Sequence, residues 1–187
     1  MHLRQAQLPD IILVEPRLFK DERGYFLETY QQQRYTAHGI PAGFVQDNLS
    51  VSRQSVVRGL HYQLNRPQGK LIMVLQGEVV DLVVDIRLNS PTFGKWTKNT
   101  LSGADHVQLY VPPGFAHGFF VTSPQAVVLY KVTDYYQPGD EYGIFWNDPD
   151  LKIDWPSSQA ILSARDQSFP RLRDIPQAFL PKMPALP

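Results

Sequence analysis

The sequence consists largely of short apolar segments, four to nine residues long and rich in Val, Ile, Leu, Phe and Tyr, which alternate with turn signals. Clusters of Gly, Pro, Asn and Asp stand at 21–24, 76–78, 89–91 and 112–114. Such segments lack the spacing of strand–helix–strand units, so they predict a mostly β protein built as a sandwich or barrel. With 187 residues, 43% of them hydrophobic, we expect one domain, residues 1–187, around a single core.

Individual strands can be placed from this pattern. Segments 70–75 and 79–86 flank a glycine turn and predict a β-hairpin. Segments 107–111 and 126–133 predict further strands, and the glutamine-rich second half of 27–37 predicts the early helix.

The last fifty residues differ, because they hold eight of the sixteen prolines. Proline forbids a long helix or a central strand, so this part is interpreted as a wrap over the barrel. Within it, Ser163 and Asp166 have the spacing of a helix capping box, which predicts a short helix beginning near Ser163. Helix capping alone could therefore explain the presence of Asp166, without any functional role.

Composition excludes several classes of partner. Eighteen basic residues balance eighteen acidic ones without a basic run, which disfavours a nucleic-acid or membrane-surface partner. The absence of cysteine excludes a disulfide framework and a thiolate nucleophile. The first ten residues, MHLRQAQLPD, lack the apolar core of a secretory signal, and no apolar run approaches the roughly 20 residues of a membrane span. We therefore expect a cytoplasmic protein.

Three residues carry the strongest chemical signal. His61 in the segment Arg-Gly-Leu-His-Tyr-Gln, Lys70 shortly after it and Tyr130 in a later strand supply a base, a cation and an acid. This set suits proton transfer at a carbon beside a carbonyl, with the ammonium stabilising the enolate oxygen. The chemistry requires no metal and no cofactor.

Strand periodicity tests whether these groups can converge, since residues two apart share a face. Tyr130 shares a face with Val128 and Val132, so its ring is expected to point into the barrel. Lys70 lies on the face of the apolar residues 72 and 74, an unfavourable place for a charge unless it meets an anion or the barrel mouth. Asp81 and Asp85 are interpreted as partners of basic neighbours.

At this point the sequence resembles the dTDP-4-dehydrorhamnose 3,5-epimerases, cupin-type jelly-roll β-barrels that act on a nucleotide-linked 4-keto-6-deoxy sugar. The resemblance runs through nearly the whole chain. The motifs that carry it are FKDERGYFLE (19–28), QDNLS (46–50), RGLHYQ (58–63), GEVVD (77–81), VDIR (84–87), PGFAHGF (113–119), YK (130–131) and LSARD (162–166).

The resemblance implies conversion of dTDP-4-dehydro-6-deoxy-D-glucose to dTDP-4-dehydro-L-rhamnose, in dTDP-L-rhamnose biosynthesis. It assigns His61 as general base oriented by Asp166, Tyr130 as general acid on the opposite face of the sugar, and Lys70 as the cation at the enolate oxygen. It also implies a homodimer in which N-terminal strands cover a sheet edge of the partner, so that hairpin residues serve the neighbouring pocket.

The resemblance also implies a set of substrate-binding residues. Guanidinium groups match the oxygens of a diphosphate, and an aromatic ring stacks on thymine. The expected contacts are Arg23, Arg58 and Arg165 with the diphosphate, Glu28 and Gln46 near the thymidine, Asn48 and His117 near the sugar, Tyr136 on the thymine ring, and Glu141 at the pocket rim.

Three alternatives remain. A metal-dependent cupin would need a His-x-His pair, but His61 is followed by Gln63 in that place, and only His117 fits its own motif. A non-catalytic sugar-nucleotide binding module would have no use for the base, acid and cation together. An epimerase that acts at C3 or C5 alone, or a ketoisomerase, has the same fold, and sequence separates these reactions poorly, although the presence of Tyr130 beside the base favours double epimerisation.

Overall fold

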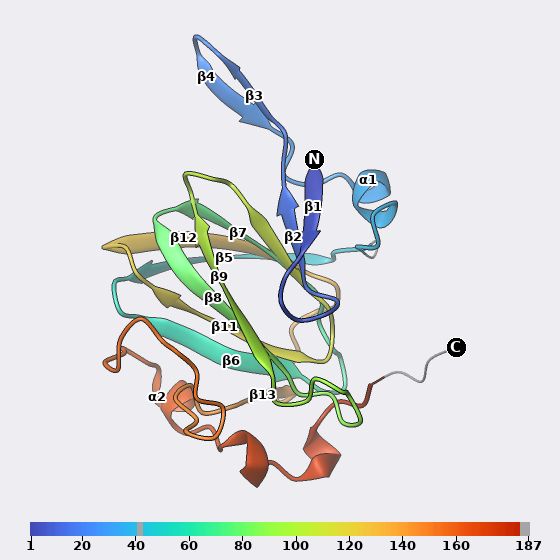
Figure 1. Ribbon diagram of the computed structural model, residues 1–187, viewed down its shortest axis with the longest axis vertical. Helices are drawn as coiled ribbons and strands as arrows, with labels where there is room; N and C mark the ends of the chain where they lie inside the picture. Colours follow the sequence, from blue (N-terminus) through green and yellow to red (C-terminus); the bar gives the residue numbers. More distant parts are fainter. Residues whose placement is uncertain (41–42, 184–187) are drawn as a thin grey trace.

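The computed structural model describes residues 1–40 and 43–183, so the last four residues of the Pro-rich segment lie outside it. The described chain forms two facing antiparallel sheets (Figure 1). The six-stranded sheet contains, in order, β1 (His2–Gln5), β2 (Ile12–Glu15), β10 (Gln108–Val111), β7 (Lys70–Gln76), β12 (Gln125–Val132) and β5 (Gln46–Arg53).

The second sheet has five strands, and a separate two-stranded hairpin stands apart from both sheets. The five strands are, in order, β13 (Glu141–Gly143), β6 (Val57–Gln63), β11 (Phe115–Val121), β8 (Glu78–Asp85) and β9 (Trp96–Ser102). The hairpin pairs β3 (Leu18–Asp21) with β4 (Gly24–Leu27) and projects from the body of the molecule (Figure 1).

The main core lies between the two large sheets. Alternate residues of each strand point inward, as the period of two requires, so Ile72 and Val74 of β7 meet Val79 and Val83 of β8. All four residues are fully buried. The two large sheets confirm the mostly β prediction, whereas the buried apolar residues fall into this main cluster and further clusters outside it. In the described residues the sheets face each other without closing into one ring.

The predicted hairpin across 70–86 is wrong in its pairing, although both strands exist. β7 pairs with β10 and β12, whereas β8 pairs with β9 and β11 of the opposite sheet. Gly77 makes this crossing with a φ of +78°, and a Cβ there would lie 2.0 Å from the carbonyl oxygen of Gln125. The sequence shows a turn, but the sheet that each strand joins depends on partners distant in the chain.

Short helices lie outside the sheets, as predicted. The first is α1 (Gln32–Thr36), within the glutamine-rich half of 27–37, and the second is α2 (Ala164–Gln167). Ser163 caps α2, since its hydroxyl accepts from the backbone N–H of Asp166 at 3.0 Å. The 3-10 turns η1 (Leu172–Asp174) and η2 (Gln177–Phe179) follow. No helix among residues 1–40 and 43–183 has the length and apolarity to cross a membrane.

The Pro-rich segment packs on the outer face of the five-stranded sheet, as the wrap prediction requires. Leu172, Ile175 and Leu180 join a buried cluster with Leu82 and Val84 of β8. Figure 1 shows this orange and red segment running beneath β6 and β13. The wrap also carries α2, which lies against β6.

Gly77→Ala should lower the free energy of unfolding by more than about 2 kcal/mol, because it combines a strained positive φ with a clash against backbone. Gly39→Ala is the matched control: its φ is +83°, but no atom lies within 4 Å of the new Cβ. The control should lose only about 1 kcal/mol. Urea unfolding of both variants measures the difference in free energy. Equal losses would refute the close approach of Gly77 to the backbone of Gln125.

Candidate active site

A cavity of about 370 Å³ opens between the two sheets. It is lined from both sheets and from the wrap, so residues far apart in sequence meet there. Eleven of the thirteen residues predicted for the site line it: Gln46, Asn48, Arg58, His61, Lys70, His117, Tyr130, Tyr136, Glu141, Arg165 and Asp166.

His61 and Asp166 form a close pair at one wall. His61 comes from β6 and Asp166 from α2, and the Nε2–Oδ1 distance is 2.6 Å. The backbone N–H of Asp166 binds the capping hydroxyl of Ser163, while its carboxylate binds the imidazole. The capping contact expected for Asp166 is therefore confirmed, and it leaves the carboxylate available for the proposed functional role, because the two contacts use different atoms. Phe169 packs edge-on against the imidazole, with ring centroids 5.6 Å apart.

The environment of His61 favours the neutral imidazole. Burial lowers the pKa of His61 below its ordinary 6.5, and this effect outweighs the hydrogen bond and charge of Asp166, which act in the opposite direction. The bond to Asp166 places the proton on Nε2 and leaves a lone pair on Nδ1. Nδ1 lies 3.8 Å from Oε1 of Glu141, another cavity residue. His61 can thus accept a proton at Nδ1 near neutral pH.

Tyr130 approaches the cavity from the facing sheet. It lies on β12, pairs with Asn48 of β5 and Ile72 of β7, and packs against the main core. Burial raises the pKa of Tyr130, with Arg58 acting weakly in the opposite direction, so the phenol stays protonated and can serve as an acid. The inward direction predicted from strand periodicity is confirmed.

A buried group of charged residues lies within the cavity region. Burial lowers the pKa of Lys70 to about 8, and the charge of Asp81 counteracts this effect. Lys70 is therefore still mostly protonated at neutral pH. Its Nζ lies 3.5 Å from the backbone oxygen of His61, to which it donates. The ammonium is thus held next to the base.

Asp81 links this cation to a second imidazole. Its Oδ2 lies 2.8 Å from Nε2 of His117, as expected for an Asp paired with a basic neighbour. Burial raises the pKa of Asp81, although His117 and Lys70 act to lower it, and its Oδ1 has no hydrogen-bond partner. Sequence reasoning did not place Asp81 in the site. A carboxylate between Val79 and Val83, at inward positions of an apolar strand, was the available signal.

Two arginines and several amide side chains line the cavity. Arg58 donates to the hydroxyl of Ser52 at 2.9 Å, and Arg165 forms an ion pair with Glu141. Gln46 donates to Asn48 at 2.8 Å along β5. The positive charge of the two guanidinium groups and the amides beside them can hold an anionic, hydrogen-bonding ligand.

Strand β5 adds a residue that sequence reasoning missed. Ser50 lines the cavity, and its hydroxyl is buried without a hydrogen-bond partner. Gln46, Asn48 and Ser50 alternate along one strand, so the period of two could have identified it.

Arg23 and Glu28 do not reach the cavity of their own chain. Arg23, whose side chain is 85% exposed, pairs with Asp21 at 2.5 Å at the turn of the β3–β4 hairpin. Glu28 follows the hairpin and lies 3.5 Å from Arg34 of α1. Both positions are set by the hairpin, which points away from the body of the molecule (Figure 1).

The position at which a metal cupin has its second histidine is used differently. The Gln63 amide hydrogen-bonds to loop backbone and does not line the cavity. Within residues 1–40 and 43–183, no group of three His, Asp or Glu side chains is arranged to hold a metal ion. The Gln63 side chain thus does not point into the cavity as a ligand at the second-histidine position would.

The His61 imidazole should titrate with a midpoint below 6.5 in an NMR pH series, because burial dominates its pKa. In Asp166→Asn the midpoint should fall further, since the carboxylate that favours the imidazolium is removed. His61→Gln assigns the resonance. A wild-type midpoint above 6.5, or an upward shift in Asp166→Asn, would contradict this account of the pair.

Comparison with known proteins identifies the family to which the chain belongs. The family model of dTDP-4-dehydrorhamnose 3,5-epimerase matches residues 5–174. A curated protein of that name from Pseudomonas aeruginosa is 50% identical over 169 residues, which cover 89% of this chain and 93% of the relative. A dTDP-4-dehydrorhamnose 3-epimerase from Streptomyces niveus is 38% identical over 169 residues, with coverages of 89% and 82%.

Solved structures extend the similarity to the whole fold. The Legionella pneumophila dTDP-6-deoxy-D-glucose-3,5-epimerase, in complex with dTDP-4-keto-L-rhamnose, superimposes with a TM-score of 0.95 and is 47% identical. The match covers 98% of this chain and 99% of that one. The chain thus belongs to the dTDP-4-dehydrorhamnose 3,5-epimerase family.

Proposed function

We propose that this protein epimerises dTDP-4-dehydro-6-deoxy-D-glucose at C3 and C5, producing dTDP-4-dehydro-L-rhamnose for dTDP-L-rhamnose biosynthesis. The observation that carries the proposal is the placement of a base and an acid on facing sheets: the His61–Asp166 pair lies at one wall of the cavity and Tyr130 on the other sheet. Inversion of a carbon requires protons to leave and arrive on opposite faces. The similar proteins from Pseudomonas aeruginosa and Legionella pneumophila are named as epimerases of this kind, which supports the proposal.

The first step is proton abstraction beside the C4 ketone. Nδ1 of His61 takes the proton, the C–H electrons form a C=C bond, and the ketone oxygen receives the negative charge. Asp166 stabilises the imidazolium that results. The Lys70 ammonium, which donates to the backbone oxygen of His61, stabilises the negative charge on the enolate oxygen.

The second step is protonation from the opposite face. Tyr130 donates its phenolic proton to the carbon, the C=O bond re-forms, and the configuration of that carbon is inverted. Exchange with water returns the proton to the tyrosine and removes the one held by His61. C3 and C5 both flank the C4 ketone, so the same enolate stabilisation serves both carbons. The remaining cavity residues bind the substrate. The diphosphate is bound by Arg58 and Arg165, the thymidine by Gln46 and Tyr136, and the sugar by Asn48 and His117. Glu141 lies at the rim of the pocket.

Tyr130→Phe should separate exchange from inversion, because it removes only the hydroxyl of the acid. In D₂O with dTDP-4-dehydro-6-deoxy-D-glucose, His61 should still exchange the α-proton for deuterium, while inverted product forms at least about 100-fold more slowly. NMR locates deuterium at C3 and C5. His61→Ala is the control and should abolish both exchange and inversion.

The same experiment distinguishes the alternatives. Wild-type deuterium at C3 alone, or at C5 alone, would replace the double epimerase by a single one. Equal loss of exchange and inversion in Tyr130→Phe would instead assign Tyr130 to an earlier step. A dTDP-binding measurement on each variant excludes misfolding as the cause.

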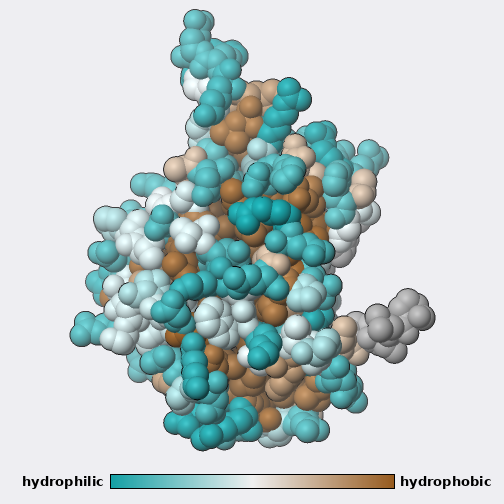
Figure 2. Space-filling model, viewed as in Figure 1, coloured by the Kyte–Doolittle hydropathy of each residue, from teal (hydrophilic) through white to brown (hydrophobic). Residues whose placement is uncertain are grey.

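We further propose that the protein is a homodimer in which the β3–β4 hairpin contacts the partner. The hairpin exposes Phe19, Tyr25 and Phe26, which are 49%, 55% and 70% exposed, and the edge strand β5 exposes Leu49 and Val51 at 59% and 51%. Figure 2 shows hydrophobic residues gathered below the projecting hairpin. Apolar side chains on a projecting hairpin and an unpaired edge are unfavourable in a monomer.

In such a dimer Arg23 and Glu28 can contribute to the partner's cavity, which explains why neither lines its own. Cytoplasmic residence is also part of the proposal, supported by a cysteine-free sequence that needs no oxidising compartment.

Mixed chains test the dimer. Arg23→Ala and His61→Ala homodimers should each be nearly inactive, whereas a 1:1 mixture refolded together should regain about a quarter of wild-type activity. Half of the dimers are then mixed, and one of their two sites has both groups. No recovery would place Arg23 with its own chain or outside the site, and sedimentation of a fully active monomer would refute the dimer.

A further inference from the structure

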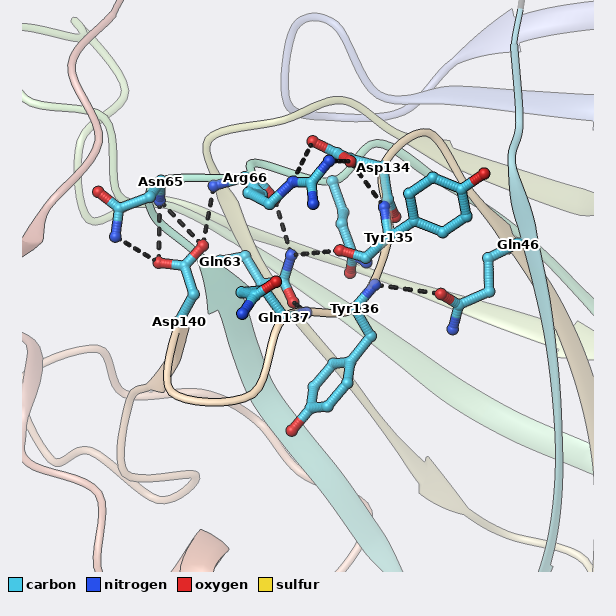
Figure 3. A network of polar contacts seen from close by, with 10 residues as sticks. Gln46, Gln63, Asn65, Arg66, Asp134, Tyr135, Tyr136, Gln137 and Asp140 are labelled. Carbon is cyan, nitrogen blue, oxygen red and sulfur yellow. Dashed lines mark hydrogen bonds and ion pairs between the residues drawn. The ribbon is translucent and has the colours of Figure 1, made fainter.

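Gln63, the last residue of β6, is buried, with 5% of its surface exposed, yet it does not line the cavity. Its side-chain amide makes three hydrogen bonds to loop backbone (Figure 3). The Nε2 group donates to the carbonyl of Arg66 at 2.7 Å and to that of Tyr135 at 3.2 Å, and Oε1 accepts from the N–H of Gln137 at 2.9 Å. Both amide hydrogens are thus used.

Two of these bonds hold the peptide groups on either side of Tyr136. The carbonyl of Tyr135 belongs to the peptide that precedes Tyr136, and the N–H of Gln137 belongs to the peptide that follows it. One rigid amide therefore fixes both peptides whose orientation determines where the Tyr136 side chain points. A third bond, from the N–H of Tyr136 to Gln46 at 3.1 Å, ties the same residue to β5.

The loop that contains Arg66, the third hydrogen-bond partner of Gln63, is also anchored. Buried Asp140 accepts from the backbone N–H groups of Asn65 and Arg66 at 3.0 and 2.8 Å. Although burial opposes ionisation, these donors hold the pKa of Asp140 below its ordinary value, so the carboxylate stays charged. Loops 64–66 and 134–140 thus form one hydrogen-bonded unit, and Figure 3 shows the Tyr136 ring extending from it.

We propose that Gln63 is a positioning residue that fixes Tyr136 for stacking on the nucleobase of the substrate, and that it thereby sets nucleotide affinity. The proposal rests on the proposed function, in which Tyr136 contacts thymine. The Tyr136 residue is 44% exposed, so packing alone does not hold its ring. Ordering the backbone before binding removes an entropy cost that the ligand would otherwise have to offset.

Gln63→Met tests this, because it keeps the length of the side chain and removes all three hydrogen bonds. The affinity for dTDP, measured by calorimetry, should fall about ten-fold in Gln63→Met and about ten-fold in Tyr136→Ala. The double variant should be no weaker than Tyr136→Ala, since Gln63 acts through that ring. With dTDP-4-dehydro-6-deoxy-D-glucose, KM should rise while kcat changes little.

Gln108→Met is the matched control, because Gln108 is also buried, binds Tyr35 and Thr29, and does not line the cavity. It should lower thermal stability without changing dTDP affinity. If Gln63→Met does not fold, Gln63→Glu serves in its place: it retains the acceptor for Gln137 and loses both donors.

Hydrogen exchange tests the positioning without a ligand. The amide of Gln137 should lose protection in Gln63→Met, and unchanged protection would overturn the proposal. Unchanged dTDP affinity, or additive losses in the double variant, would also overturn it. A wild-type protein that does not bind dTDP, or Tyr136→Ala that binds as well as wild type, would instead refute the proposed nucleotide contact while the exchange result still decides whether Gln63 orders the loop.

Discussion

The site depends on the burial of polar groups between two apolar sheets. Along β7 and β8 the inward positions include the apolar residues Ile72, Val74, Val79 and Val83. Two inward positions of the same strands are charged, namely Lys70 and Asp81. Burying a charge without a partner is costly, so each such group must meet another or face the cavity. The core thus provides both the rigidity of the site and the low dielectric in which its charges act.

Desolvation then determines the protonation states on which the chemistry depends. It lowers the pKa of His61, which favours the neutral imidazole of the proposed base, and raises the pKa of Tyr130, which favours the protonated phenol of the proposed acid. It also lowers the pKa of Lys70 to about 8, a value that Asp81 keeps from falling further. One physical effect, burial, thus acts on all three groups that are proposed as base, acid and cation.

The irregular segments complete what the sheets begin. The Pro-rich wrap has no long element of its own, yet it carries Asp166 to His61 because its apolar residues pack on the five-stranded sheet. The loops held by Gln63 and Asp140 place Tyr136 at the cavity in a similar way. Apolar packing thus holds the wrap, and buried hydrogen bonds, which are strong where water is excluded, hold the loops.

The sequence by itself determined four of the strands, the capped helix at Ser163, and the inward faces of Lys70 and Tyr130, because turn residues, capping spacing and strand period act over a few residues. Family motifs added the site residues that line the cavity. Only the tertiary structure decided that β7 and β8 enter different sheets and that the Gln63 amide holds the loop at Tyr136. These outcomes depend on which distant surfaces pack together, and local sequence carries no record of that choice.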